Sequence, residues 1–319
     1  MRKLFFILMA LVPTMLWAQF APEAGVAGTT AIHCDSSAFV AWATGCTIER
    51  GPIQIGITDS LVSYGVDDDA IGKADNMVVS LGDGGMAVLT FASPICNEVG
   101  PDFAVFENPF HNAPHCFLEL AFVEVSSDGE NYFRFPAVTN VPFETQMGGF
   151  GVMDATMIHN FAGKYEVMYG TPVDLDEVED DARLDKGRIT HVRLVDVIGT
   201  IDPEYATYDS EGHIVNDPFP TPYWSSGFDL DAVGVIHDLA HFDVPENQLD
   251  VVSVYPNPVM DRLTVKAENL QSVEIYNLVG QQVVTSSSPV IDFSDLNEGV
   301  YFVRVTADGK TITKRVVKQ

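Results

Sequence analysis

The sequence predicts an all-β protein: a jelly-roll-like β-sandwich domain followed by a small immunoglobulin-like β-sandwich. Short runs of alternating apolar and polar residues recur along the chain, for example at residues 86–91, 118–125 and 189–197. Clusters of Gly, Asp and Pro separate these runs, as at residues 82–85 and 202–203, and such clusters favour tight turns. Many short strands with frequent turns are typical of sandwiches and jelly rolls.

The chain begins with a segment typical of a secretory signal peptide, which we place at residues 1–19. Residues 2–3 are basic, residues 4–17 are an apolar run, and the small residue Ala18 marks a cleavage site. The run is shorter than the roughly 20 apolar residues that a transmembrane helix needs. Because no later stretch is long and apolar enough either, we expect an exported protein with no transmembrane segment.

The large sandwich is expected at residues 20–248. Residues 20–250 carry 8 Lys or Arg side chains against 38 Asp or Glu side chains. Such a domain repels nucleic acid and anionic membrane surfaces, so nucleic acid is excluded as a partner. The acidity suits an extracellular domain that binds cations or neutral ligands; alternatively, it only keeps an exported protein soluble.

Further strands are expected at residues 103–106, 132–135 and 231–236, and a helix is possible at residues 176–184, whose charges fit a solvated surface segment equally well. Residues 119–133 contain a strand, a Ser-Ser-Asp-Gly turn and an aromatic return strand. This hairpin resembles that of discoidin-type, galactose-binding-like jelly rolls. The runs DFAVFENPF and GFDLDAVGVIH also resemble exported cell-surface proteins of Bacteroidetes, which implies a fold and an address rather than an activity.

The four cysteines all lie in the central domain, at Cys34, Cys46, Cys96 and Cys116. An even number of cysteines in an exported protein indicates two disulfides, for which three pairings are possible. We favour Cys34–Cys46 and Cys96–Cys116, because each pair brackets a local loop. No CxxC spacing is present, so metal binding by these thiols is not expected.

Acidic residues at the ends of apolar strands are candidate ligands for a calcium ion. Two-residue periodicity places Asp229 and Asp231 on an inward face with Val233, and Leu230 on the opposite face. Carboxylates held on an apolar face repel each other unless a cation or hydrogen-bond donors neutralise them, and Ca²⁺ takes 6–8 oxygen ligands. Alternatively, these acids cap turns, accept backbone N–H bonds or pair with arginines. The candidate ligands are Asp102, Glu107, Asp196, Asp229 and Asp231.

Two Pro-rich loops carry candidate ligand-binding side chains. In one of them, His111 and His115 lie four residues apart and either bind a transition metal, line a pocket or do neither. In the other, Tyr223 and Trp224 offer flat rings on which a sugar can stack. The alternative for this second loop is that it folds back to cover one end of the sandwich.

The small C-terminal sandwich is expected at residues 249–319. The motifs YPNP, IYNLVGQ and LNEGVYFVRV occur there in this order, followed by a basic final strand. They resemble the type A C-terminal sorting domain of the Bacteroidetes type IX secretion system. The resemblance implies that residues 251–319 engage the type IX machinery, and that the protein passes through the periplasm to the cell surface or the extracellular space.

These features predict an exported, calcium-stabilised binding protein that recognises a carbohydrate or another environmental ligand. The first alternative is a secreted polysaccharide hydrolase, because two suitably spaced carboxylates are enough for that chemistry. No G-x-S-x-G, HExxH or P-loop motif is present, however, so binding is favoured over catalysis. The second alternative is an adhesin, or an accessory that captures nutrients for an outer-membrane transporter, and the fold alone does not decide among them.

Overall fold

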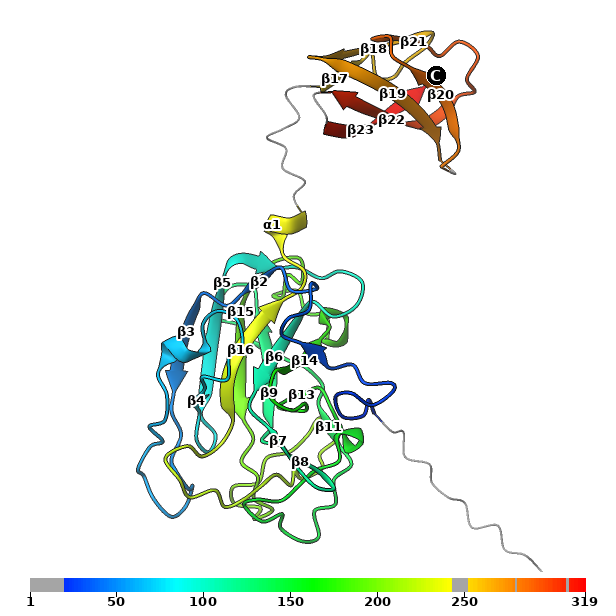
Figure 1. Cartoon of the computed structure of the whole chain (residues 1–319). Coiled ribbons are helices and arrows are strands. Elements are labelled where there is room, and N and C mark those ends of the chain that lie inside the picture. The colour runs from blue at the N-terminus through cyan, green and yellow to red at the C-terminus, as the bar shows by residue number, and fades with distance from the viewer. Residues whose placement is uncertain (1–19, 243–251, 279, 308–309) are drawn as a thin grey trace, which may run out of the picture. The chain divides into compact units, whose positions relative to one another are not determined.

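The computed structural model describes residues 20–242, 252–278, 280–307 and 310–319, and the chain divides into two compact units, Met1–Phe242 and Asp243–Gln319 (Figure 1). The expected signal peptide and the expected domain boundary between residues 248 and 249 lie outside the described residues.

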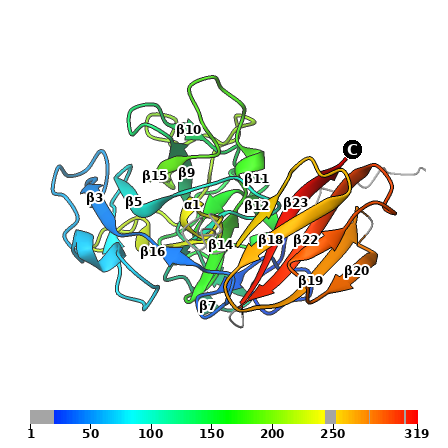
Figure 2. The ribbon, with the colours of Figure 1, turned by 90° about the horizontal axis from the view of Figure 1, so that it is seen from above.

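The first unit is a β-sandwich of two antiparallel sheets (Figures 1 and 2). The first sheet has the order β1 (Ile32–His33), β14 (Tyr169–Val173), β6 (Phe103–Glu107), β16 (Asp229–Val235), β2 (Ala41–Trp42), and β4 (Val79–Ser80) also pairs with β16. The second has the order β10 (Phe133–Arg134), β9 (Ala121–Ser126), β15 (Ile189–Asp196), β5 (Met86–Ile95), β3 (Gly45–Glu49), and β13 (Phe161–Ala162) also pairs with β9.

One hydrophobic core fills the space between these sheets. Along β6, Phe103 and Val105 belong to this core, whereas Ala104 and Phe106 belong to a separate cluster on the other face of the strand. The second sheet contributes alternate residues of its central strands: Ala87, Leu89, Val123, Val125, Val192 and Leu194. The period-two pattern in the sequence therefore identifies the buried faces of these strands.

Strand β16 departs from simple alternation. Its pairing with β6 shifts between Leu230 and Ala232, so Asp231 is the extra residue of a β-bulge. Leu230 and Val233 consequently both belong to the core between the sheets. The prediction that these two side chains lie on opposite faces is wrong, because the bulge inverts the alternation at one residue.

All six strands that the sequence predicts in the central domain are present, as β5, β6, β9, β10, β15 and β16. The expected hairpin joins β9 to β10, with Phe133 opposite Val125. In its turn, the amide of Gly129 donates a hydrogen bond of 2.9 Å to the Ser126 hydroxyl. The charged stretch at residues 176–184 contributes only the end of a short 3-10 helix, η3 (Leu175–Glu177), followed by turns.

Shorter elements complete the first unit. They are the hairpins β7 (Phe110–Asn112) with β8 (His115–Phe117) and β11 (Val138–Thr139) with β12 (Ile158–His159), the 3-10 helices η1 (Asp67–Ala70) and η2 (Ala155–Met157), and helix α1 (Leu239–Phe242).

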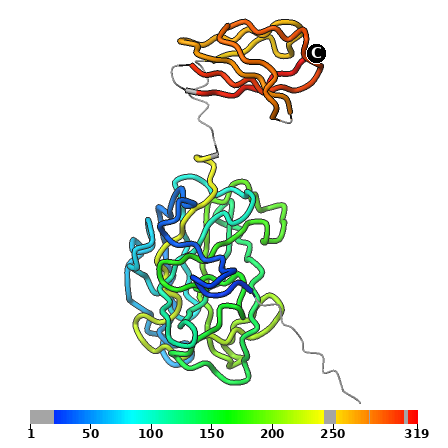
Figure 3. Tube along the Cα trace, turned by 45° about the vertical axis from the view of Figure 1, so that its right-hand side comes forward, coloured from blue at the N-terminus to red at the C-terminus, as the bar shows by residue number. Residues whose placement is uncertain are grey.

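The N-terminal segment runs over the side of the first unit, where it lies against residues from the middle of the chain (blue against green in Figure 3). The amide of Phe20 donates to the carbonyl of Thr156 at 3.0 Å, and the Phe20 ring stacks on His159 at 4.9 Å between ring centroids. These contacts place the start of the described chain beside η2 and β12.

The second unit is a smaller antiparallel sandwich. One sheet contains β17 (Val252–Tyr255), β18 (Arg262–Ala267) and β21 (Val290–Asp292), and the other contains β20 (Gln282–Ser286), β19 (Leu270–Asn277), β22 (Gly299–Ala307) and β23 (Lys310–Lys318). A separate core that includes Leu263, Ile275 and Val303 lies between them, as the sequence predicts. No helix in the described parts of either unit has the length and hydropathy needed to cross a membrane.

Candidate functional site

Buried carboxylates gather at the end of the first sheet where β6 finishes and β16 begins. Glu107 is the last residue of β6 and lies opposite Leu230, next to Asp229 at the start of β16. The charges of Asp229, Glu107 and Asp217 all act on Glu119, the residue two positions before β9. Glu107 is 2% exposed and Asp229 is 8% exposed. We call Glu107, Glu119, Asp217 and Asp229 the carboxylate cluster.

Burial disfavours the ionised form of every member of the cluster. Burial, and then the charge of Asp229, raise the pKa values of Glu107 and Glu119 well above their usual range. Burial raises the pKa of Asp229 to about 7, and burial also raises that of Asp217 well above its usual range. At neutral pH the cluster therefore holds carboxyl groups that favour a proton or a cation.

Two oxygens of the cluster have no hydrogen-bond donor among the described residues. They are Glu107 Oε2 and Asp217 Oδ1, both fully buried. The other oxygen of Asp217 accepts from the amide of Leu120 at 3.1 Å, and Asp229 accepts from the Ser80 hydroxyl. A buried oxygen without a partner costs about 1–3 kcal/mol, so these positions favour an additional donor or a metal ion.

Asp102, one of the predicted calcium ligands, does not join the cluster. It lies at the opposite end of β6 from Glu107, about 16 Å away at the rise of a strand. Its carboxylate accepts hydrogen bonds of 2.9 Å from the amides of Glu98 and Leu175, and pairs with His237 at 2.9 Å. Asp102 therefore links the segments that carry Glu98, Leu175 and His237.

The carboxylates of Asp196 and Asp231 each accept hydrogen bonds from two backbone amides. The donors are Gly84 (2.8 Å) and Phe228 (2.7 Å) for Asp196, and Asp75 and Asn76 (both 3.1 Å) for Asp231. Burial nevertheless raises the pKa values of both carboxylates. The charge of Asp196 also acts on Glu119, and that of Asp231 acts on Glu107.

Two members of the cluster, Glu119 and Asp217, are absent from the sequence-based set. Glu119 precedes the apolar strand β9 just as Asp102 precedes β6, so the rule that selects acids beside apolar strands applies to it equally. Asp217 lies in a loop and has no such signal in the sequence. Only the packing of this loop against Leu120 places it in the cluster.

Aromatic side chains form a connected and partly exposed row near this end of the unit. Phe110 stacks on Phe117 at 5.0 Å between ring centroids, Phe117 lies 6.1 Å from Phe150, and Phe150 lies 6.4 Å from Tyr223. Phe150 is 65% exposed and Tyr223 is 50% exposed. We call these four residues the aromatic row. The adjoining Trp224 is 64% exposed.

The backbone holds the Tyr223–Trp224 loop in place although its rings are exposed. The carbonyl of Trp224 accepts hydrogen bonds from the amides of Ser63 (2.9 Å) and Tyr64 (3.1 Å). The amide of Ser226 donates to the carbonyl of Tyr223 at 3.1 Å. The two rings that the sequence singled out therefore project from an anchored loop.

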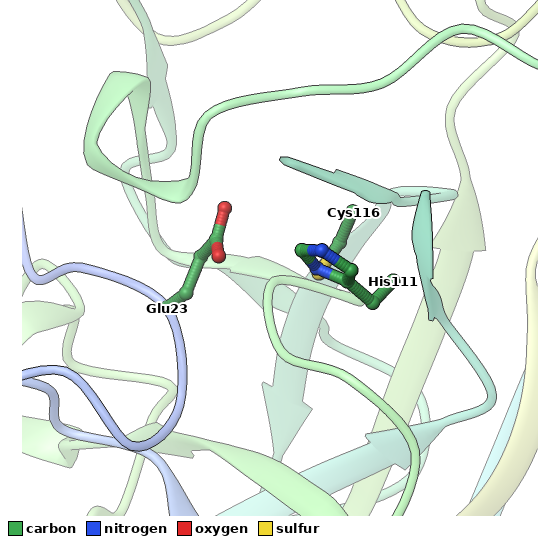
Figure 4. Close-up of side chains that lie close together, drawn as sticks. All are labelled: Glu23, His111 and Cys116. Atoms are coloured by element: carbon green, nitrogen blue, oxygen red, sulfur yellow. The ribbon is translucent and has the colours of Figure 1, made fainter. Parts of the chain in front are cut away.

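His111 and His115 occupy the β7–β8 hairpin. His111 lies opposite Cys116 across the hairpin, and its Nδ1 is 4.0 Å from the cysteine sulfur. His115 Nδ1 instead lies 3.1 Å from Oε1 of Glu23, in the N-terminal segment. Glu23, His111 and Cys116 point toward one another (Figure 4) and, with Glu166, line a cavity of about 240 Å³.

All four cysteines lie in the described part of the chain, and all four are free thiols. The expected disulfides Cys34–Cys46 and Cys96–Cys116 are therefore not formed. Cys34 follows β1 in the first sheet, whereas Cys46 lies on β3 in the second. Similarly, Cys96 follows β5, but Cys116 lies on the β7–β8 hairpin. Closeness in sequence misled the prediction, because consecutive strands belong to different sheets.

The comparisons with known proteins concern the second unit and a short stretch of the chain. Residues 253–319 match the family described as the secretion system C-terminal sorting domain. This chain is a cargo of the type IX secretion system. It is exported to the cell surface or the extracellular space. The chain is also similar to ulvan lyase NLR42 of Nonlabens ulvanivorans, with 36% identity over 83 residues. That similarity covers 23% of this chain and 16% of the lyase.

Proposed function

We propose that this exported protein binds a carbohydrate or another environmental ligand on the aromatic row and Trp224, and that a calcium ion bound by the carboxylate cluster stabilises the same domain. The observation that carries the proposal is the aromatic row, in which the buried ring of Phe117 connects the exposed rings of Phe110 and Phe150, and Phe150 lies beside Tyr223. Tyr223 and the exposed Trp224 project from an anchored loop. Isolated exposed apolar side chains are ordinary on protein surfaces, whereas contiguous ones mark binding sites.

The chemistry of this surface favours a neutral ligand with flat apolar faces. Aromatic rings stack on the apolar face of a sugar ring, while hydroxyl groups at its edge remain hydrated. The central domain carries many more acidic than basic side chains, so its field opposes polyanions. A neutral glycan is therefore favoured over a strongly acidic one.

Calcium suits the cluster for two reasons. Glu107 Oε2 and Asp217 Oδ1 have no donor among the described residues, and oxygen is the ligand that this hard cation prefers. Calcium–oxygen distances of 2.3–2.6 Å place ligands on opposite sides of the ion about 5 Å apart. Among the described residues, the groups of three donors within 4.8 Å of one another do not include the carboxylate cluster, so a calcium ion would have to draw these side chains together.

A polysaccharide hydrolase is the second candidate function, and the short similarity to the protein named ulvan lyase NLR42 gives it slight support. A general acid must reach the glycosidic oxygen directly or through one water. Members of the carboxylate cluster are buried, which opposes this role for them. An adhesin or nutrient-capture accessory would use the same exposed rings on a protein or a transported ligand.

Substitution of the two exposed loop rings tests the binding proposal. The double variant Tyr223→Ala, Trp224→Ala should lose retention on a panel of immobilised neutral polysaccharides, while Tyr255→Ala should not. Tyr255 is a matched control, because it is 49% exposed and lies in the second unit. Equal retention of the double variant and the wild type would exclude this surface. Release of oligosaccharides by the wild type would favour the hydrolase.

A further inference from the structure

The Glu23–His111–Cys116 group differs in kind from the carboxylate cluster. It offers one carboxylate oxygen, one imidazole nitrogen and one thiol sulfur, and these three donor atoms all lie within 4.8 Å of one another. Within the described residues, the other group of three donors that meets this spacing is the sequence-local His33–Cys34–Asp35. Glu23 and the hairpin, by contrast, are far apart in sequence and are brought together by the fold.

The hairpin register explains how two of these side chains meet. His111 and Cys116 are cross-strand partners, so their side chains emerge on the same face of the β7–β8 hairpin. Their neighbours Phe110 and Phe117 are the next cross-strand pair and emerge on the opposite face, where they belong to the aromatic row. One face of the hairpin thus carries the row, and the other carries metal-binding donors.

The third donor is oriented by a hydrogen-bonding partner. His115 Nδ1 lies 3.1 Å from Glu23 Oε1, which leaves Glu23 Oε2 free to act as a ligand. Carboxylates that bind metal ions in proteins are commonly held in this way by a second side chain. His115 is therefore a positioning residue for Glu23.

We propose that Glu23, His111 and Cys116 bind a borderline divalent transition-metal ion, with Zn²⁺ as the best fit, at the cavity that they line. Zinc accepts this mixture of oxygen, nitrogen and sulfur ligands and prefers four of them. Three protein ligands leave the fourth position for water from the cavity. At zinc–ligand distances of 2.0–2.3 Å, tetrahedral ligands lie about 3.5 Å apart, so the donors need to close by about an ångström.

Electrostatics at the cavity favour a cation. Glu23 and Glu166 are two acidic side chains that line the cavity beside Cys116. Their negative charge attracts a metal ion, and the metal displaces the thiol proton when it binds. Lys164 is the basic group among the lining residues; its ammonium donates to the carbonyl of Ile158 at 2.8 Å, and burial lowers its pKa to about 8.

The bound ion would fasten the N-terminal segment to the hairpin. Glu23 comes from the segment that begins the described chain, and the hairpin supports Phe110 and Phe117 of the aromatic row. This site is independent of the carboxylate cluster in residues, ligand type and preferred metal. Its existence does not depend on the proposed binding function.

Titration of the exported protein with Co²⁺, a spectroscopic substitute for Zn²⁺, tests the site. The wild type should bind one ion and show thiolate-to-cobalt charge-transfer absorption, and Zn²⁺ should displace it. Cys116→Ser should abolish the charge-transfer absorption. Cys96→Ser is the matched control and should leave it unchanged, because Cys96 is also a buried thiol but lies outside both groups of three donors.

Variants at the more accessible ligands keep the test informative if the Cys116 variant misfolds. Glu23→Gln and His111→Gln should each weaken Co²⁺ binding at least tenfold, and His115→Ala should weaken it about 10–100-fold through loss of positioning. Wild-type cobalt spectra and affinity in the Glu23 and His111 variants would overturn the proposal. Charge-transfer absorption that persists in Cys116→Ser and disappears in Cys34→Ser would instead assign the ion to His33–Cys34–Asp35.

Discussion

Replacement of Asp229 by Asn tests whether the carboxylate cluster holds an unfavourably buried charge that a calcium ion neutralises. Asp229 is buried, and its pKa is raised from 3.8 to about 7. At 1.36 kcal/mol per pKa unit, holding this carboxylate ionised at pH 8 costs at most about 4 kcal/mol. The variant retains an oxygen that can accept from the Ser80 hydroxyl.

In the presence of chelator at pH 8, Asp229→Asn should therefore unfold at a higher temperature than the wild type. A gain of about 1–4 kcal/mol corresponds to a rise of several degrees in a domain of this size. In calcium this advantage should shrink or reverse, because the variant lacks a ligand. The wild type at 100 times its calcium Kd should gain about 2.7 kcal/mol, or about 5–11 °C, and the variant should gain much less.

Asp102→Asn is the matched control for a buried acid outside the cluster. Asp102 accepts hydrogen bonds from two backbone amides and from His237, and an amide side chain cannot accept all three. This variant should lose about 1–3 kcal/mol with its calcium response intact. Differential scanning calorimetry in calcium and in chelator measures both effects. A lower melting temperature of Asp229→Asn in chelator, or an unchanged calcium response, would refute the reasoning.

The pH dependence has a definite sign. A carboxyl group whose pKa is higher in the folded state binds more protons there than in the unfolded state. For Asp229 the window runs from about pH 4 to about pH 7. In chelator, this group's contribution to the free energy of unfolding should therefore fall as pH rises through that window. Calcium needs the ionised form, so its stabilising effect should be larger at pH 8 than at pH 5.

Three further predictions concern other parts of the chain. Deletion of residues 253–319 should leave the protein in the periplasm, measured by cell fractionation, and continued surface display would contradict the role of the sorting domain. Asp196→Ala should cost about 2–6 kcal/mol in urea unfolding, because the amides of Gly84 and Phe228 each lose a buried acceptor; a loss below 1 kcal/mol would show that water replaces the carboxylate. Thiol titration of the denatured, unreduced protein should find four free thiols. A count of zero would show instead that the four cysteines form two disulfides.

Local pattern was a reliable guide to strands and an unreliable guide to faces where the backbone is irregular. The six expected strands of the central domain are present, because alternation and turn residues act over a few neighbouring positions. The bulge at Asp231 is the exception. The bulge changes which face of β16 the side chains after it occupy, and the apolar–polar alternation of that strand does not predict it.

The sequence by itself determined the two all-β units, the positions of their main strands and, through the motifs near the C-terminus, the export of the protein. Only the tertiary structure decided which acids share a site. Glu107 joins Asp229 and Asp217, while Asp102 lies at the far end of the same strand. Glu23 likewise reaches Cys116 only because the N-terminal segment crosses the folded domain. The physical reason is that pattern and turn chemistry are local, whereas a site depends on the order in which distant strands pair.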